Sequence, residues 1–403
     1  MKAVVFHGVG DIRLDKVSDP KIEEPTDAIV RLTASAICGT DLHFVRGTVP
    51  GMESGTILGH EGVGVVEEVG KDVRNLSPGD RVVIPSTIAC GTCSYCRAGY
   101  YSQCDDANPN GAQAGTAFYG GPKLTGPFQG LQAEFARIPY AHVGLVKLPP
   151  EVRDDQAILI SDIFPTAYFG AELAEIRPGD SVAVFGCGPV GQFAIAGAQL
   201  LGAGRVLAVD TVPDRLDMAR AQGAEVIDFN AEHPVEAIQR LTGGIGVDRA
   251  IDAVGVDAYM PQHGPGKVAR ASRKQYEREI ESIEAQGESL ADDWTPGDAP
   301  SEVFSWAIAA LAKAGTFSII GVYPPTFQSF PIGMAMSRNL TLRMGNCPHR
   351  KYIPKLINLV RNGTVDPLKI LTRRAPLTSA IEAYKTFAEH QPGWVKVELE
   401  PVS

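Results

Sequence analysis

Hydrophobic runs of strand length alternate with longer, helix-like segments through the second half of the chain. The runs lie at 181–185, 205–209, 224–227, 247–255, 315–321 and 339–344. Strands alternating with helices are typical of a parallel sheet that carries helices on both faces. We therefore predict an α/β domain built on a doubly wound parallel sheet.

The first part of the chain has a different pattern. Short apolar runs such as Ala28–Thr33 are bounded by Pro20, Pro25 and several glycines. Short strands separated by proline and glycine turns predict a β-rich, barrel-like domain. The run W-V-K-V-E-L-E that ends at Glu400 reads as a further strand, which we expect to return to this domain. The predicted domains are 1–163, 164–345 and a returning segment 346–403.

One segment interrupts the α/β pattern. Residues 256–301 are polar and punctuated by prolines, and a charged block from Arg270 to Gln286 looks helical and solvent-facing. We expect a surface insertion here. A flap over a bound cofactor and a contact between subunits are the alternatives.

Composition and charge narrow the possible partners. The chain has 403 residues, enough for two or three domains, and a net charge of -10 without a long block of like charges. That balance disfavours nucleic acid or an anionic membrane as the main partner. The N-terminal run lacks the pattern of a signal peptide, and the apolar region Ser181–Val209 is too broken for a membrane span. Seven cysteines, four of them clustered, indicate metal binding in a reducing cytoplasm.

The cysteine cluster has a spacing typical of a structural metal site. The four residues follow the pattern C-x2-C-x2-C-x7-C at Cys90, Cys93, Cys96 and Cys104. Four thiolates in so short a loop can surround one tetrahedral zinc ion. An iron–sulfur cluster is the competing interpretation, because C-x2-C-x2-C also occurs in ferredoxins.

A second candidate metal site lies in I-C-G-T-D-L-H and the following L-G-H-E. Cys38 and His60 are a thiolate and an imidazole, the ligand types that zinc takes in open catalytic sites. Thr40 and His43 are placed to pass a proton. Asp41 can accept the second ring N–H of His60 and so fix its tautomer.

A third ligand is suggested further along the chain. Asp162 is an acid within the apolar run L-I-S-D-I-F-P-T. A carboxylate in such surroundings is costly unless it is paired or binds a metal ion. The local pattern fits a helix N-cap equally well, because Pro165 and Thr166 can open a helix just afterwards.

A dinucleotide site is predicted where the first strand of the α/β domain ends. The motif G-x-G-x-x-G, with Gly186, Gly188 and Gly191, follows a strand and opens a helix, and Pro189 and Val190 complete the turn. Asp210 ends the next strand, where an acid can hydrogen-bond the adenosine ribose and repel a 2′-phosphate. This favours NAD over NADP. Arg215 is expected to cover the ribose or a phosphate.

Together these motifs resemble the zinc-containing alcohol dehydrogenases of the medium-chain dehydrogenase/reductase superfamily over essentially the whole chain. The resemblance rests on G-H-E-G-V-G-V-V-E-E-V-G-K-D-V from Gly59, the four clustered cysteines, and G-C-G-P-V-G at 186–191. The runs S-D-I-F-P-T at 161–166 and I-A-C-G-T-C around Cys90, with the long segment after Asp252, are most similar to the glutathione-independent formaldehyde dehydrogenase branch.

The resemblance implies a fold and a set of roles. Residues 1–163 and 346–403 would form a GroES-like catalytic domain, and 164–345 an NAD-binding Rossmann domain with the insertion 256–301. Most family members have a cysteine as third ligand of the catalytic zinc, but this branch has an aspartate, which matches Asp162. The implied roles are catalytic zinc ligands at Cys38, His60 and Asp162, a near-zinc acid at Glu61, a proton relay through Thr40 and His43, and a structural zinc on the cysteine lobe 90–104.

The expected function is zinc- and NAD-dependent oxidation of an alcohol or hydrated aldehyde by hydride transfer, or the reverse reaction. One alternative is an aldehyde (formaldehyde) dismutase that keeps NAD bound through turnover. A polyol dehydrogenase and, from another class, a non-catalytic NAD-binding protein are further alternatives. The resemblance also implies a homo-oligomer, a tetramer or a dimer, and the cysteine pattern predicts a cytoplasmic location.

Overall fold

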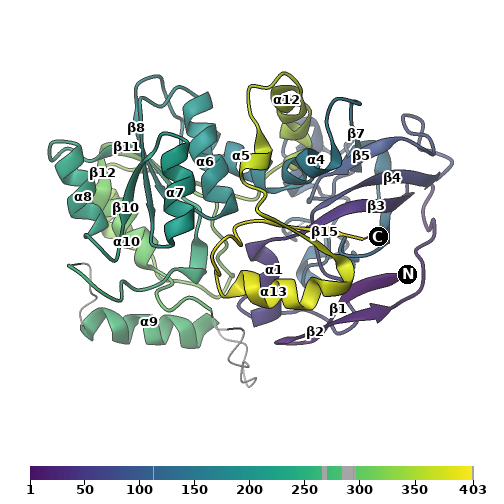
Figure 1. Ribbon diagram of the computed structural model, residues 1–403, viewed down its shortest axis with the longest axis horizontal. Coiled ribbons are helices and arrows are strands. Elements are labelled where there is room, and N and C mark those ends of the chain that lie inside the picture. The colour runs from purple at the N-terminus through teal and green to yellow at the C-terminus, as the bar shows by residue number, and fades with distance from the viewer. Residues whose placement is uncertain (112, 266–269, 284–293, 295, 402–403) are drawn as a thin grey trace. The chain divides into compact units, whose positions relative to one another are not determined.

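The computed structural model describes residues 1–111, 113–265, 270–283, 294 and 296–401. The chain forms two compact units (Figure 1). Of the described residues, 1–111, 113–165, 294 and 346–401 belong to the first unit, and 166–265, 270–283 and 296–345 belong to the second. Within the described residues, no helix is both long and apolar enough to cross a membrane.

The second unit is built on a six-stranded sheet in the order β10-β9-β8-β11-β12-β13, with every neighbouring pair parallel. Helices α6 and α7 cover one face, and α8 and α10 cover the other (Figure 1). The predicted doubly wound α/β fold is confirmed. Its strands are β8 Ser181–Phe185, β9 Arg205–Asp210, β10 Glu225–Asp228, β11 Val247–Asp252, β12 Leu311–Ile319 and β13 Thr341–Met344.

Prolines mark the start of several helices in this unit. Three of them start with a proline, whose missing N–H has no partner in a first helical turn. Their apolar sides bury residues such as Phe193, Ala219 and Ile238. The helices are α5 Ile163–Leu173, which starts in the first unit, α6 Pro189–Leu200, α7 Pro213–Ala221, α8 Pro234–Leu241, α9 Arg270–Ile283, α10 Glu302–Ala310 and α11 Ile332–Ser337.

The strand order creates a place for a ligand. The chain leaves β8 toward β9 on one side and returns to β11 on the other, so the connections diverge at the carboxyl ends of β8 and β11. Ligands of open α/β sheets bind at such a switch point. The Gly186–Gly191 turn lies at this edge, directly after β8.

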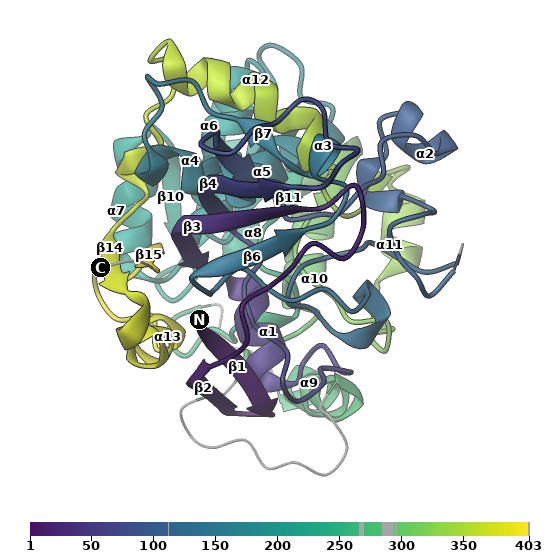
Figure 2. The same ribbon diagram turned by 90° about the vertical axis from the view of Figure 1, so that its right-hand side faces the viewer.

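The first unit is β-rich, as predicted. A hairpin pairs β1 with β2, and a seven-stranded sheet has the order β14-β15-β3-β4-β5-β7, with β6 also pairing with β3. Figure 2 shows β3, β4 and β6 side by side. The strands are β1 Lys2–Gly8, β2 Asp11–Lys16, β3 Ala28–Ile37, β4 Gly62–Val69, β5 Arg81–Ile84, β6 Phe135–Ile138, β7 Val146–Lys147, β14 Arg373–Pro376 and β15 Val397–Glu400.

Residues from the last part of the chain complete this sheet. Strand β15 pairs antiparallel with β3, so that Val397 lies opposite Ile37, directly before the Cys38 stretch. Segments from the two ends of the sequence therefore pack in one core, next to Cys38, the first of the candidate ligands. The helices of the unit are α1 Gly39–Arg46, α2 Ser94–Arg97, α3 Ala141–Gly144, α4 Asp154–Ser161, α12 His349–Arg361 and α13 Ala380–Ala388.

The charged block of the expected insertion forms helix α9, but this helix is not wholly solvent-facing. Tyr276, Glu279 and Ile283 are buried, which is one face at helical spacing. The Tyr276 hydroxyl hydrogen-bonds Glu302 of α10, and Ser301 donates to Glu279 over 2.9 Å. Charged residues occupy most of the remaining positions of α9, so the sequence alone did not predict that one face of the helix is buried. The parts of the predicted insertion at 266–269, 284–293 and 295 lie outside the described residues.

Candidate active site

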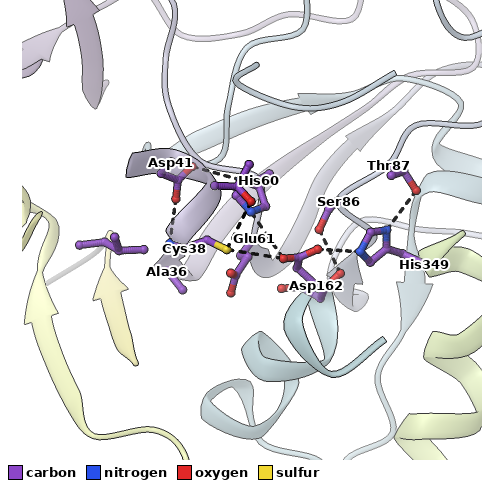
Figure 3. Close-up of polar contacts among 12 residues, drawn as sticks. Ala36, Cys38, Asp41, His60, Glu61, Ser86, Thr87, Asp162 and His349 are labelled. Carbon is purple, nitrogen blue, oxygen red and sulfur yellow. Dashed lines mark hydrogen bonds and ion pairs between the residues drawn. The ribbon is translucent and has the colours of Figure 1, made fainter. Parts of the chain in front are cut away.

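Four potential metal ligands from three distant segments converge in the first unit (Figure 3). Cys38 is the N-cap of α1, His60 and Glu61 directly precede β4, and Asp162 lies between α4 and α5. Each offers one ligand atom, all within 4.8 Å of one another, and all four residues are buried. The structure thus brings together the three predicted ligands and Glu61.

The spacing of these atoms suits one tetrahedral ion. Cys38 Sγ lies 3.8 Å from Asp162 Oδ2, and His60 Nε2 lies 3.5 Å from the same oxygen. Bonds of about 2.0–2.3 Å in a tetrahedron separate ligand atoms by roughly 3.3–3.8 Å. His60 Nε2 and Glu61 Oε2 are buried and have no hydrogen-bond partner among the described residues. Such orphaned atoms are costly, and a bound cation would satisfy them. The residues therefore fit zinc.

Asp41 holds two members of the cluster. Its Oδ2 accepts the backbone N–H of Cys38 over 2.9 Å, and its Oδ1 lies 3.1 Å from His60 Nδ1. Gln132 donates to Asp41 over 3.4 Å, and the Tyr384 hydroxyl donates to Gln132 over 2.8 Å. The whole chain of contacts is buried. The Asp41–His60 contact lacks hydrogen-bond geometry, but Asp41 lies beside the ring nitrogen that a carboxylate contacts when it orients a ligand histidine.

His349 and Lys396 contact the cluster and were not predicted from the sequence. His349 Nε2 lies 2.6 Å from Asp162 Oδ1. Lys396 Nζ donates to Glu61 Oε1 over 2.6 Å and to the Ile37 carbonyl over 3.0 Å, and it is fully buried. A lysine between two valines was the only local signal for Lys396. No sequence pattern around His349 indicated that it contacts the site.

The two carboxyl groups differ electrostatically. Burial raises the pKa of Glu61 to about 7, against the opposing attraction of Lys396. Asp162 is equally buried, but its hydrogen bond with His349 and the nearby His60 imidazole outweigh the effect of burial and hold its pKa well below the ordinary value. Asp162 is therefore ionised at neutral pH, as a metal ligand must be.

The predicted relay residues lie on α1, beside the cluster. Thr40 Oγ1 is 3.9 Å from Cys38 Sγ, and Thr40 is only partly buried. His43 is buried, and its Nδ1 lies 3.0 Å from Thr48 Oγ1. Both residues thus have polar contacts near the cluster.

The four clustered cysteines form a second group, with ligand atoms all within 4.8 Å of one another. Cys93 Sγ and Cys104 Sγ are 3.9 Å apart. Backbone N–H groups point at the sulfurs: those of Thr92 and Cys93 at Cys90, both over 3.3 Å, and that of Cys96 at Cys93 over 3.4 Å. N–H donors of this kind stabilise thiolates, the form that binds metal.

In the second unit, the Gly-rich turn is too tight for side chains. A Cβ on Gly191 would lie 1.8 Å from the Gly186 carbonyl oxygen, and Gly186 has a φ of 86°. Gly188 is the N-cap of α6 and Pro189 is its first residue. The turn therefore presents bare backbone at a helix N-terminus, which suits a pyrophosphate.

Asp210 is hydrogen-bonded to the backbone of this turn. Asp210 ends β9 and accepts the backbone N–H of Cys187 over 2.7 Å. Its other oxygen accepts the N–H groups of Thr211 and Val212 over 2.7 and 2.9 Å. Arg215 Nη1 lies 4.0 Å from Asp210. An acid and a guanidinium thus flank the glycine turn, as the sequence motif suggests.

A parallel sheet with a dinucleotide-type turn and a β-rich unit with a Cys/His/carboxylate cluster define a two-domain, metal-dependent dehydrogenase. Comparisons with known proteins agree with this class. Residues 24–150 match the alcohol dehydrogenase GroES-like domain, and residues 189–263 match the zinc-binding dehydrogenase family.

Similar proteins cover the whole chain. A zinc-type alcohol dehydrogenase-like protein of Bacillus subtilis is 37% identical over 100% of both chains. A glutathione-independent formaldehyde dehydrogenase of Pseudomonas aeruginosa is 35% identical, over 89% of this chain and 87% of its own. The solved structure of the alcohol dehydrogenase TADH from Thermus sp. ATN1 has a TM-score of 0.80 at 35% identity, with 99% of each chain covered. The chain belongs to the zinc-type alcohol dehydrogenase family and is an oxidoreductase.

Proposed function

We propose that the protein oxidises an alcohol or hydrated aldehyde with NAD, or runs the reverse reaction, at a zinc ion held by Cys38, His60 and Asp162. The observation that carries this proposal is the convergence of the three ligand atoms at tetrahedral spacing, with His60 Nε2 left unsatisfied. Bound zinc and NAD supply a Lewis acid for the substrate oxygen and an acceptor for hydride. Glu61, with one unsatisfied oxygen, is the proposed near-zinc acid.

The chain's own residues must bring the substrate to the cluster and remove its proton. Thr40 is the proposed first acceptor of the hydroxyl proton, because its hydroxyl lies beside Cys38 and remains partly accessible. His43 is the proposed next carrier, since an imidazole can take up and release a proton near neutral pH. Burial of the cluster supports the reaction, because water is excluded from charges that develop there.

NAD is the proposed cofactor of the second unit. Gly186, Gly188, Pro189, Val190 and Gly191 would hold its pyrophosphate at the start of α6. Asp210 already accepts three backbone N–H groups, and a carboxylate has about four acceptor sites, so one remains for a ribose hydroxyl. Its negative charge disfavours a 2′-phosphate. Arg215, 4.0 Å away, is proposed to cover the ribose or a phosphate.

A second, structural zinc ion is proposed for the lobe of Cys90, Cys93, Cys96 and Cys104. Four sulfurs around zinc at about 2.3 Å lie roughly 3.8 Å apart, close to the 3.9 Å between Cys93 and Cys104. An iron–sulfur cluster has its own sulfide and several irons between the thiolates, so it needs them further apart. With all four positions filled, this zinc would take no part in the reaction.

A cytoplasmic homo-oligomer, tetrameric or dimeric, completes the proposal. The seven cysteines all lie in the described part of the chain and form no disulfide there, and four of them cluster as possible metal ligands, which supports a reducing compartment. Strand β13 is at one edge of its sheet, and nearby Ile332, Met334, Met336 and Met344 are exposed. Exposed apolar side chains beside an open strand edge support a contact between subunits.

The test is a zinc and absorbance analysis of the purified protein, followed by a screen for NAD reduction. The screen covers formaldehyde, short primary and secondary alcohols, diols and benzylic alcohols. Two zinc ions per chain and activity only with added NAD are expected. NAD that co-purifies, with turnover of aldehyde alone, would identify the dismutase. NAD binding without turnover of any substrate would favour the non-catalytic alternative.

A further inference from the structure

We propose that His349 is a positioning residue, which anchors one oxygen of Asp162 so that the carboxylate presents only the other oxygen to Cys38 and His60. This inference rests on the proposed function, because it gives His349 a task in the zinc site. It concerns a residue some 187 positions beyond Asp162 that contacts the cluster from outside.

The two oxygens of Asp162 have different surroundings (Figure 3). Oδ1 is 2.6 Å from His349 Nε2. Oδ2 is 3.5 Å from His60 Nε2 and 3.8 Å from Cys38 Sγ. The carboxylate is therefore held at one end and offered at the other, which makes it a ligand through a single oxygen.

His349 is itself held in place. Its Nδ1 lies 3.2 Å from Thr87 Oγ1, and both residues are 3% exposed. A carboxylate oxygen accepts, so Nε2 is the ring nitrogen that must donate to Asp162, which leaves Nδ1 facing the Thr87 hydroxyl. The contact with Thr87 therefore holds the ring so that Nε2 faces Asp162. This arrangement reverses the common one, in which a carboxylate orients a metal-binding histidine.

The backbone around both residues is fixed by independent contacts. His349 opens α12, and just before it the Asn346 carbonyl accepts the Ser102 hydroxyl over 2.8 Å. On the other side, the Ser86 hydroxyl donates to the Ser161 carbonyl over 3.3 Å, next to Asp162. Asp162 has the non-helical angles φ -139° and ψ -66° between two helices. The two helices therefore do not by themselves fix the orientation of the Asp162 carboxylate, and the contact with His349 is needed to do so.

The experiment compares His349→Leu with His349→Gln. Leucine fills the space but donates nothing, whereas the glutamine amide can reach the position of Nε2 and donate to Asp162. Zinc retention is titrated with a chelator, and the visible spectrum of the cobalt-substituted protein reports the ligand geometry. We expect His349→Leu to hold the catalytic zinc about 10- to 100-fold more weakly, with an altered cobalt spectrum. The lobe zinc should remain, and His349→Gln should recover most of both properties.

The chain provides a matched control. His7 Nε2 contacts Asp15 Oδ2 over 2.7 Å, a histidine–aspartate pair of nearly the same length on the β1–β2 hairpin. His7→Leu removes this pair without touching either cysteine-containing cluster. Its zinc retention and cobalt spectrum are expected to equal those of the unaltered protein.

Failure of the proposed function and failure of the His349 proposal would give different results. Wild-type protein with a single zinc per chain, located in the lobe, would overturn the proposed function. Two zincs in the wild type, with unchanged chelator sensitivity and spectrum in His349→Leu, would overturn the anchor alone. If His349→Leu does not fold, Thr87→Val takes its place, because it frees the imidazole from its partner. A smaller spectral change in the same direction is then expected, and an unchanged spectrum would count against the anchor.

Discussion

The cysteine lobe takes its four sulfurs from residues 90–104, whereas the candidate catalytic cluster draws Cys38 and Asp162 from positions 124 residues apart. In the lobe, the N–H groups of Thr92, Cys93 and Cys96 that point at the sulfurs come from the same short loop. Around the catalytic cluster, the supporting side chains include His349 and Lys396 from the last part of the chain. A closed structural site can thus be local, while a reactive one needs long-range support.

This difference follows from what each site must do. Four thiolates satisfy an ion completely and need little else to fix them. A cluster with one position left for substrate has fewer ligands to define its geometry. Buried groups outside it, such as Asp41 and Lys396, must therefore orient the ligands and balance their charge. Substitution of a ligand should therefore have different effects on turnover in the catalytic cluster and in the cysteine lobe.

The largest effect is expected for Asp162→Asn. The change removes the negative charge that faces Cys38 and His60, so the catalytic zinc should be lost while the lobe zinc remains. Because the Lewis acid contributes several kcal/mol, turnover should fall about 1,000-fold or more. Metal analysis and steady-state kinetics check this. Two zincs per chain in the variant would show that Asp162 is not a required ligand.

Lys396→Met should mainly cost stability. It leaves Glu61 buried without its cation, which typically destabilises a protein by about 3–5 kcal/mol. Burial already raises the pKa of Glu61 to about 7, above its unfolded value. Loss of Lys396 raises that pKa further, so variant and wild type should differ least where Glu61 is protonated in both, and the extra loss of stability should grow as the pH rises above about 7.

Denaturant unfolding at two pH values measures this effect. The double variant Glu61→Gln/Lys396→Met is the control, because it removes both charges together. It should recover most of the stability lost in the single variant. A double variant as unstable as the single one would argue against the buried pair as the cause.

Thr40→Ala tests the relay beside the cluster. A lost proton-transfer group should lower turnover about 100-fold. Zinc content should stay at the wild-type level, because Thr40 is 3.9 Å from the sulfur and is not in the ligand set. The comparison is made on one preparation by zinc analysis and kinetics. Parallel loss of zinc and turnover would contradict the relay role.

Cys93→Ser should have the smallest effect on catalysis. It removes a ligand from the lobe, so one zinc per chain should be lost and proteolysis should increase within 90–104. Turnover of the folded protein should change by less than about threefold, because the lobe zinc has no open position. If turnover fell as far as in Asp162→Asn, the separation between a structural and a reactive site would be wrong.

The same contrast explains what the sequence could predict. The lobe is visible in a spacing pattern, and the sheet of the second unit in alternating runs, because both depend on neighbouring residues. Asp162 was ambiguous locally and became a candidate ligand only through the family resemblance. His349 and Lys396 carried no usable pattern, since their partners lie 187 and 335 residues away. The buried face of α9 was missed because Tyr276 and Glu279 are surrounded by charges.

The pairing of β15 with β3 also sets an order of events during synthesis. The lobe can capture its metal once residues 90–104 have left the ribosome. The reactive centre must wait until Lys396 has emerged, because Glu61 and the Ile37 carbonyl lack their partner before then. A nascent chain is therefore expected to bind the proposed structural ion well before it gains a competent reaction centre, which forms only after β15 has emerged.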